Sequence, residues 1–210
     1  MTDEEKGNFC AWAVSLLAPP DEETAGYLKE GEIQSLLAEN ITEWGGDPGL
    51  LAELAGEKDP GGDLPALQGE YDRLFAALPG PRISLVESTY KPWTGDGSCA
   101  LAFAGDKGCL MGDGAAHMRE IYRRLSLEVP EEFRSTPDHL ILELEFLSLL
   151  YRSAAPEQVQ GFIADHLDWV PELKERVDQA APHPFYRRAI ELLNLFLLHE
   201  RRGKAGNHGP

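Results

Sequence analysis

Residues 137–152 read PDHLILELEFLSLLYR, and this stretch decides the fold class. Its apolar side chains fall on nearly every side of an α-helix, which is typical of a helix buried at the centre of a protein. Pro137 favours a helix start because proline is well tolerated in the first turn, and Thr136 is a preferred N-cap residue. The stretch therefore predicts a central buried helix over residues 137–152.

The same pattern returns near the C-terminus, where residues 185–200 follow Pro184 and leave little polar surface. We predict that this helix packs against the central one. Other segments have helical apolar spacing or a proline that starts a helix: residues 4–18, 21–44, 113–127 and 156–167, and the stretches from Pro48, Pro65 and Pro171. No strand-like alternation persists, so we predict an all-α fold, a single globular bundle of about eight to ten helices over residues 1–202.

Glycine and proline mark the connections between these helices. Residues 56–63 (GEKDPGGD) predict a mobile loop, Pro79-Gly80-Pro81 a break, and residues 82–90 an extended segment. The Gly-rich stretch 94–108 (TGDGSCALAFAGDKG) predicts a long loop or hinge, with a short ordered piece around Ala100–Phe103. We expect the tail, residues 203–210, to be disordered.

The net charge of −17 is concentrated at the start of the chain, where residues 1–70 hold 16 acidic and 3 basic side chains. This sign argues against nucleic-acid binding, which requires lysine and arginine against phosphate. It suits a cationic partner, although solubility alone also explains it.

The sequence indicates a cytoplasmic protein without stable membrane insertion. No apolar run is long enough to span a bilayer, and Met1–Lys6 is acidic where a secretory signal would be basic. Cys10, Cys99 and Cys109 form no C-x-x-C pair, so we expect free thiols in a reducing compartment.

Common catalytic motifs are absent: the chain has no P-loop, no G-x-S-x-G and no H-E-x-x-H. Asp138, in the predicted first turn, is well placed for the helix dipole. His139 and Glu143 are i, i+4 neighbours that could share a metal, but no third ligand is evident and a hydrogen-bonded pair is the simpler interpretation. A small helical nucleotide- or metal-binding enzyme centred on Asp138, His139 and Glu143 is therefore the alternative function.

Three groups of motifs change the balance between these interpretations. The first is Tyr71-Asp-Arg-Leu74-Phe75, followed by Pro81-Arg82 and Glu87-Ser-Thr-Tyr90. The second is Pro137-Asp-His-Leu140, leading into Glu143-Leu-Glu-Phe-Leu147. The third is His166-Leu-Asp-Trp-Val-Pro171, then His183-Pro-Phe-Tyr-Arg187. In order and spacing, over about residues 70–200, they resemble the TorD/DmsD/NarJ family of cytoplasmic redox-enzyme maturation chaperones.

The resemblance implies a binding protein, not an enzyme, with no cofactor or metal of its own. Such a chaperone binds the twin-arginine signal peptide and the apo catalytic subunit of a molybdopterin-dependent oxidoreductase, and it assists cofactor insertion and proofreading before export. It would be a monomer or homodimer and would bind no nucleic acid. Stabilisation by a twin-arginine peptide, rather than by GTP, a metal or a pterin, would separate this function from the alternative.

The resemblance also implies a binding site for the peptide. The expected groove has aromatic and apolar residues on one side, Asp138-His139 on the other, and the loop around Glu87–Trp93 with Gly112 completing it. The predicted site residues are Tyr71, Leu74, Phe75, Glu87, Tyr90, Trp93, Gly112, Pro137, Asp138 and His139. For the aromatic residues, ordinary core packing is an equally good explanation.

Overall fold

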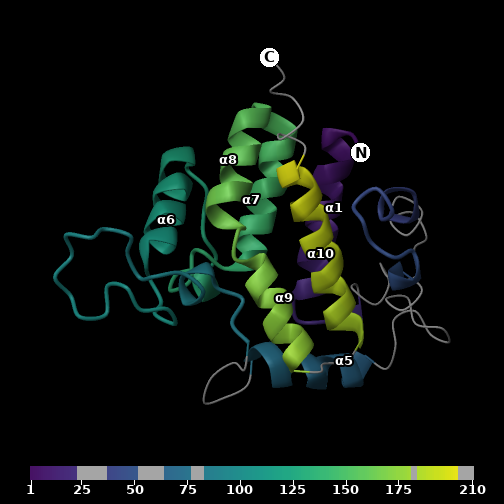
Figure 1. Cartoon of the computed structure of the whole chain (residues 1–210), viewed down its shortest axis with the longest axis horizontal. Coiled ribbons are helices and arrows are strands. Elements are labelled where there is room, and N and C mark those ends of the chain that lie inside the picture. The colour runs from purple at the N-terminus through teal and green to yellow at the C-terminus, as the bar shows by residue number, and fades with distance from the viewer. Residues whose placement is uncertain (23–36, 52–63, 77–82, 181–183, 203–210) are drawn as a thin grey trace.

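The structure, a computed structural model, describes residues 1–22, 37–51, 64–76, 83–180 and 184–202 (Figure 1). The α-helices are α1 (Asp3–Leu17), α5 (Leu64–Tyr71), α6 (Asp113–Leu125), α7 (Leu140–Ser153), α8 (Pro156–His166), α9 (Val170–Gln179) and α10 (Pro184–Arg202). Short turns of other helix types are η1 (Asp72–Ala76), η2 (Glu87–Thr89) and η3 (Glu131–Phe133). These residues hold no strand, only an isolated bridge between Val86 and His139, so the predicted all-α fold is confirmed. Of the helices described, none is both long and apolar enough to cross a membrane.

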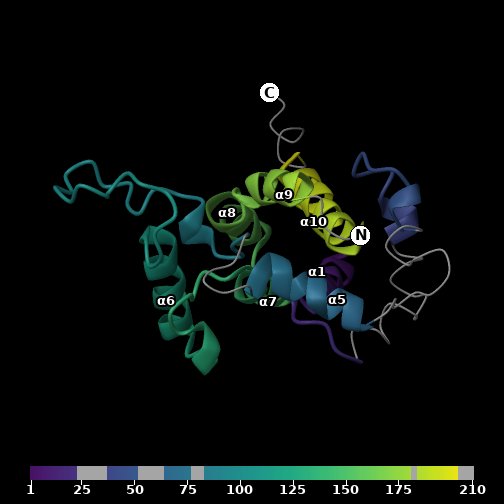
Figure 2. The ribbon, with the colours of Figure 1, turned by 90° about the horizontal axis from the view of Figure 1, so that it is seen from below.

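Helix α7 lies at the centre of the molecule, as its apolar pattern predicts. Leu140, Leu144 and Leu147 are completely buried. Its main neighbour is α1, which approaches closely at Gly7, where the Ser148 hydroxyl donates to the Gly7 carbonyl oxygen at 2.8 Å. Figure 2 shows α7 and α1 on one side of the bundle and α8, α9 and α10 on the other.

Helix α10 packs mainly on α9, α1 and α8 rather than along α7. It meets α7 through Tyr151, whose ring lies 6.2 Å from that of Phe196 and whose hydroxyl donates to Glu200 at 2.9 Å. The predicted pairing of the two apolar helices is thus limited to the C-terminal end of α7.

Helix α7 begins three residues later than residues 137–152 predict, and this corrects the role expected for Asp138. The N-cap is His139, not Thr136, and Asp138 lies outside the helix. The reason is tertiary: Asp138, His139 and Leu140 pair with the segment that precedes η2. That segment is extended at Val86 and then turns into η2, so the extended conformation predicted for residues 82–90 does not continue to Tyr90.

Residues 94–108 contain no helix, and the loop projects from the body of the molecule beside α6 (Figure 1). Backbone hydrogen bonds close it at its base, from Trp93 N to Asp106 O at 3.0 Å and from Gly108 N to Thr89 O at 3.0 Å. All three cysteines are free, and Cys99 and Cys109 are partly exposed. A hinge function for this loop stays a prediction.

Other predictions fall outside the described residues. These are most of the helix over residues 21–44, the loop 56–63, the break at residues 79–81, His183 and the tail 203–210.

Candidate functional site

The segment Ile83–Tyr90 connects two of the sequence motifs, Tyr71–Phe75 and Pro137–Leu140. Its first residue donates a backbone hydrogen bond to Leu74, from Ile83 N to Leu74 O at 3.0 Å. Further along, Leu140 N donates to Leu85 O at 2.8 Å and Glu87 N donates to Asp138 O at 3.0 Å. The Tyr71–Phe75 motif and the Pro137–Leu140 motif are therefore joined by one short stretch of backbone, although they are far apart in sequence.

Asp138 is completely buried and binds this segment directly. Its Oδ2 accepts hydrogen bonds from the Ser88 amide at 2.8 Å and from the Ser88 hydroxyl. Burial raises the pKa of the Asp138 carboxyl, while the two bonds from Ser88 act in the opposite direction. Its Oδ1 receives no hydrogen bond from the described residues, so one oxygen retains the capacity to accept.

His139 caps the start of α7, and its partners differ from those of Asp138. Its Nδ1 accepts a hydrogen bond from Ile141 N at 3.3 Å, and its ring lies 4.8 Å from that of Phe133. Burial lowers the pKa of His139 to about 4, so the ring is neutral at pH 7. It therefore gives the site a neutral side chain at physiological pH.

A glycine is required at position 112 because the backbone of Trp93 lies too close to leave room for a side chain. A Cβ there would lie 2.6 Å from the carbonyl oxygen of Trp93, which also accepts from Asp113 N at 2.9 Å. Gly112 N in turn donates to the Ser88 hydroxyl at 3.3 Å. Gly112 and Trp93 thus belong to the same assembly as Ser88 and Asp138.

The aromatic site residues separate into different clusters. Tyr71 and Phe75 pack together, with ring centroids 5.3 Å apart, and both contact Tyr186 of α10. Tyr90 instead stacks on Trp169 at 4.6 Å, and its hydroxyl donates to Ser84 O. Tyr71, Leu74 and Tyr90 are buried, whereas Phe75 and Trp93 are partly exposed. Pro137, beside Asp138, is buried as well.

Glu87 is at the centre of a buried polar network that the sequence did not predict. Its Oε1 accepts from Lys91 Nζ at 2.6 Å, and its Oε2 lies 2.9 Å from His166 Nδ1. Burial alone would raise the pKa of Glu87, but His166 and Lys91 outweigh it, so the pKa falls below its usual range. Lys91 also binds Asp165 O and the Asp168 carboxylate, both at 2.6 Å, at the end of α8.

Glu143 lies against the same network, one turn into α7. It is completely buried, and neither carboxyl oxygen receives a hydrogen bond from a described residue. Burial and the neighbouring Glu87 raise the pKa of Glu143 well above the usual range, which favours its protonated form. Carboxyl oxygens of Glu87 and Glu143 and a ring nitrogen of His166 all lie within 4.8 Å of one another.

The hydrogen-bonded pair expected for His139 and Glu143 is not formed, and the two side chains do not take the shared metal position considered as the other possibility. His139 is turned toward Ile141 N and Phe133, and the imidazole beside Glu143 belongs to His166. His166 was missed because it is 79 residues from Glu87, and Lys91 was missed although it is only four residues from Glu87, because its contacts with Asp165 O and Asp168 come from a distant part of the chain. The sequence signal that could have pointed to His166 was the His166–Pro171 motif. Its histidine is the residue that lies beside Glu87.

Comparison with known proteins gives the context for this assembly. The family model described as the nitrate reductase delta subunit matches residues 37–182. This chain belongs to that family. The matched part of the chain contains every residue of the predicted site, from Tyr71 to His139. Membership of the nitrate reductase delta subunit family, which includes TorD and NarJ proteins, confirms the resemblance seen in the sequence motifs.

Among curated relatives in the nitrate reductase delta subunit family, the chain is 31% identical over 121 residues to chaperone protein TorD of Vibrio cholerae serotype O1, strain El Tor Inaba N16961. It is 30% identical to TorD of the Classical Ogawa 395 strain. In both cases the match covers 50% of this chain and 55% of the relative, so the chain spans about half the length of the curated relatives it matches.

A crystal structure of a candidate redox enzyme maturation protein from Archaeoglobus fulgidus has the same fold. The TM-score is 0.53 with 21% sequence identity, and the match covers 95% of this chain and 93% of that one.

Proposed function

We propose that this protein is a redox-enzyme maturation chaperone. In this proposal it binds the twin-arginine signal peptide and the apo catalytic subunit of a molybdopterin-dependent oxidoreductase, until the cofactor is inserted and export can proceed. It acts as a binding protein and not as an enzyme. The proposal includes the cytoplasmic location expected from the sequence.

The observation that carries the proposal is the convergence of the family's motifs on the segment Ile83–Tyr90. Leu74, Asp138 and Leu140 all hydrogen-bond to this segment or its ends through their backbones. An aromatic cluster at one end and a buried carboxylate at the other match a peptide that is apolar in one part and cationic in the next.

Asp138 is the residue we assign to the arginine-rich part of the peptide. A guanidinium forms strong, directional hydrogen bonds with a carboxylate, and Asp138 Oδ1 has no donor among the described residues. Because Asp138 is completely buried, the peptide reaches it only when Ser88 and the residues around Gly112 move aside. Binding of the arginine side chain would then replace the hydrogen bonds from Ser88.

The apolar part of the peptide is assigned to Tyr71, Leu74 and Phe75. Phe75 is the partly exposed member of this group, and it packs on Tyr71 and on Tyr186. Aromatic side chains provide a large contact area at a small cost in conformational entropy, which suits the binding of apolar peptide residues. The acidic surplus of the chain increases the rate at which a cationic peptide arrives.

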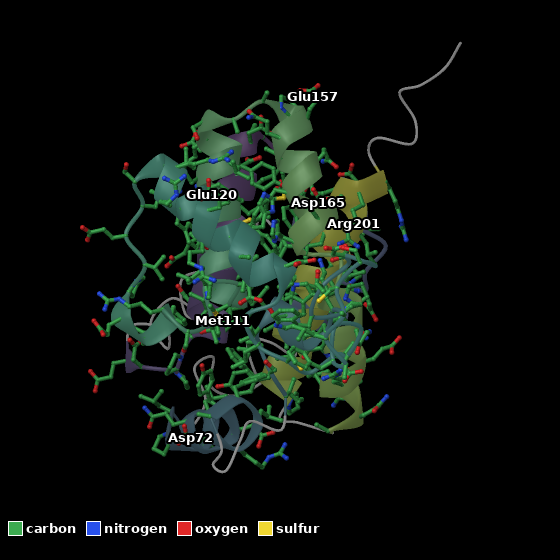
Figure 3. The ribbon with its side chains drawn as sticks, turned by 90° about the vertical axis from the view of Figure 1, so that its left-hand side faces the viewer. Asp72, Met111, Glu120, Glu157, Asp165 and Arg201 are labelled. Carbon is green, nitrogen blue, oxygen red and sulfur yellow. The ribbon has the colours of Figure 1, made fainter. Side chains whose placement is uncertain are left out.

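The test is titration calorimetry of the Asp138→Asn variant with a synthetic twin-arginine peptide. Removal of the charge at constant size is expected to weaken binding by about 1.5–3 kcal/mol, because a charge-assisted hydrogen bond becomes a neutral one. The matched control is Asp165→Asn, which removes one negative charge from an exposed position on α8 (Figure 3). Full affinity in a folded Asp138→Asn protein would exclude Asp138 from peptide binding.

A further inference from the structure

The buried group formed by Glu87, Glu143 and His166 has a composition that structural packing alone does not explain. Its members come from η2, α7 and the C-terminal end of α8, and His117 of α6 lies beside His166. A buried carboxyl without a hydrogen-bond donor is costly, so its retention needs a compensating partner. Neither carboxyl oxygen of Glu143 receives a hydrogen bond from a described residue, and one of them lies within 4.8 Å of a Glu87 carboxyl oxygen and of a His166 ring nitrogen.

A second buried glutamate shows how this protein satisfies such a group when the role is structural. Glu200 of α10 is 6% exposed, comparable to the fully buried Glu143. Its carboxylate accepts from Lys6 Nζ at 2.9 Å and from the Tyr151 hydroxyl at 2.9 Å. Glu143 receives no equivalent hydrogen bond from a cation or hydroxyl of the described residues.

We propose that Glu87, Glu143 and His166 bind a divalent transition-metal ion, with Zn²⁺ as the best match. Two carboxylates and one imidazole are a ligand set that zinc accepts, whereas the imidazole argues against Mg²⁺ and Ca²⁺. The three ligand atoms lie within 4.8 Å of one another, whereas a tetrahedral zinc ion with ligands at about 2.0–2.2 Å sets its ligand atoms roughly 3.3–3.6 Å apart, so side-chain rotations that move these atoms by on the order of 1 Å would complete the coordination. Three protein ligands leave a fourth position open.

His117 supplies the outer contact that a metal-bound histidine normally has. Its Nδ1 lies 2.7 Å from His166 Nε2, and the two rings stack with centroids 4.8 Å apart. When His166 Nε2–H donates to His117, His166 Nδ1 presents its lone pair toward Glu87 Oε2 and the metal position. Because His117 is exposed, it also marks the side from which an ion reaches the site.

Lys91 is compatible with a metal at this position. It binds Oε1 of Glu87, whereas Oε2 is the oxygen that faces His166. Its ammonium group is also held by Asp165 O and Asp168. The two positive charges would therefore lie on opposite oxygens of one carboxylate.

The test measures retention of Zn²⁺ by the purified full-length chain after dialysis against zinc chloride and removal of free metal. The wild type is expected to retain one zinc ion per chain and to give visible absorption bands with Co²⁺. Glu143→Gln keeps the volume of the side chain but removes a charged ligand, so zinc affinity should fall at least tenfold. The matched control is Glu145→Gln, which removes the same charge from an exposed position on the same helix and should bind as the wild type does.

Two results would overturn the proposal. One is a wild-type protein that retains no zinc at micromolar free metal, and the other is a Glu143→Gln variant that retains zinc as tightly as the wild type, which would place the ion elsewhere. Circular dichroism verifies that each variant is folded, and Glu87→Gln serves as the second ligand variant. The measurement uses no peptide, so its outcome is independent of the proposed chaperone function.

Discussion

At the residue scale, the side chains around Glu87 are held by one another rather than by solvent. Glu87 is 1% exposed, and each of its oxygens has a cation or an imidazole beside it. Asp138 is held in the same way by Ser88. Because buried polar groups lose their hydration, the removal of one partner leaves the other uncompensated. Substitutions of these buried polar residues should therefore change the free energy of unfolding by more than the small change in side-chain volume suggests.

The Gly114→Ala substitution tests how tightly the Glu87 carboxylate is held. A Cβ at Gly114 would lie 2.6 Å from Glu87 Oε2, and that carboxylate is fixed by Lys91 and His166. We expect a loss of about 1–3 kcal/mol in the free energy of unfolding, typical of overpacking. Urea denaturation measures it.

The control for this substitution is Gly161→Ala, in the middle of α8, where a Cβ meets nothing within 4 Å. There alanine should stabilise the protein by about 0.5–1 kcal/mol. If the two substitutions change stability in the same direction, the proximity of Gly114 to Glu87 has no energetic consequence.

The pH dependence of stability tests the environment of His139. Burial lowers the folded-state pKa of His139 to about 4, below the value of about 6.5 in an unfolded chain. The unfolded chain therefore binds more protons between these values, and stability falls as the pH decreases from about 6.5 toward 4, by on the order of 3 kcal/mol from this residue.

His139→Asn isolates this contribution because asparagine retains an N-cap acceptor but does not titrate. Urea denaturation of both proteins at pH 7 and pH 4.5 should show a smaller loss of stability in the variant. The same acid-induced loss in both proteins would show that His139 is not buried in a neutral form.

At the element scale, α7 organises the molecule because it contacts α1 on one side and α8 on the other. Its apolar residues predicted a central helix, and Leu140, Leu144 and Leu147 are indeed completely buried. The start of the helix was predicted incorrectly because local preferences favour Thr136 and Pro137, whereas the segment Leu85–Ser88 binds Asp138 and Leu140. Such a contact, between residues about 50 positions apart, has no local sequence signal.

Leu147→Ala on α7 should lower the free energy of unfolding by about 2–5 kcal/mol, because it removes a completely buried side chain and leaves a cavity. Leu149→Ala is the matched control, since Leu149 lies two residues further along α7 and is 41% exposed. It should change stability by less than about 0.5 kcal/mol. Chemical denaturation of both variants measures the difference, and equal losses would place Leu147 outside the core.

At the scale of the whole molecule, the sequence predicted the fold class and the family but only part of the candidate site. The motifs at Tyr71–Phe75 and Pro137–Leu140 were recognisable because they are contiguous. The network of Glu87, Lys91 and His166 was not, because His166 is 79 residues from Glu87 and the chemistry of the network depends on burial. The expectation that Asp138 is a helix-start residue fails for the same reason, since its partner is Ser88.

The negative charge of the whole chain also affects how strongly it attracts the proposed cationic peptide. A net charge of −17 attracts a cationic peptide over distances comparable to the Debye length, about 10 Å at 0.1 M salt, and this attraction weakens as salt is added. The attraction is not specific for arginine, so in the proposed function specificity has to come from the buried carboxylate of Asp138. Arginine and lysine peptides of equal charge separate these two effects.

The most direct test of the chaperone function is therefore the affinity of the wild-type protein for two synthetic signal peptides, identical except that the arginine pair is replaced by a lysine pair. Titration calorimetry at physiological ionic strength should show binding of the twin-arginine peptide and at least tenfold weaker binding of the twin-lysine peptide, because a lysine ammonium lacks the planar fork that pairs with a carboxylate. Equal affinities, or no binding of either peptide, would contradict the proposed function.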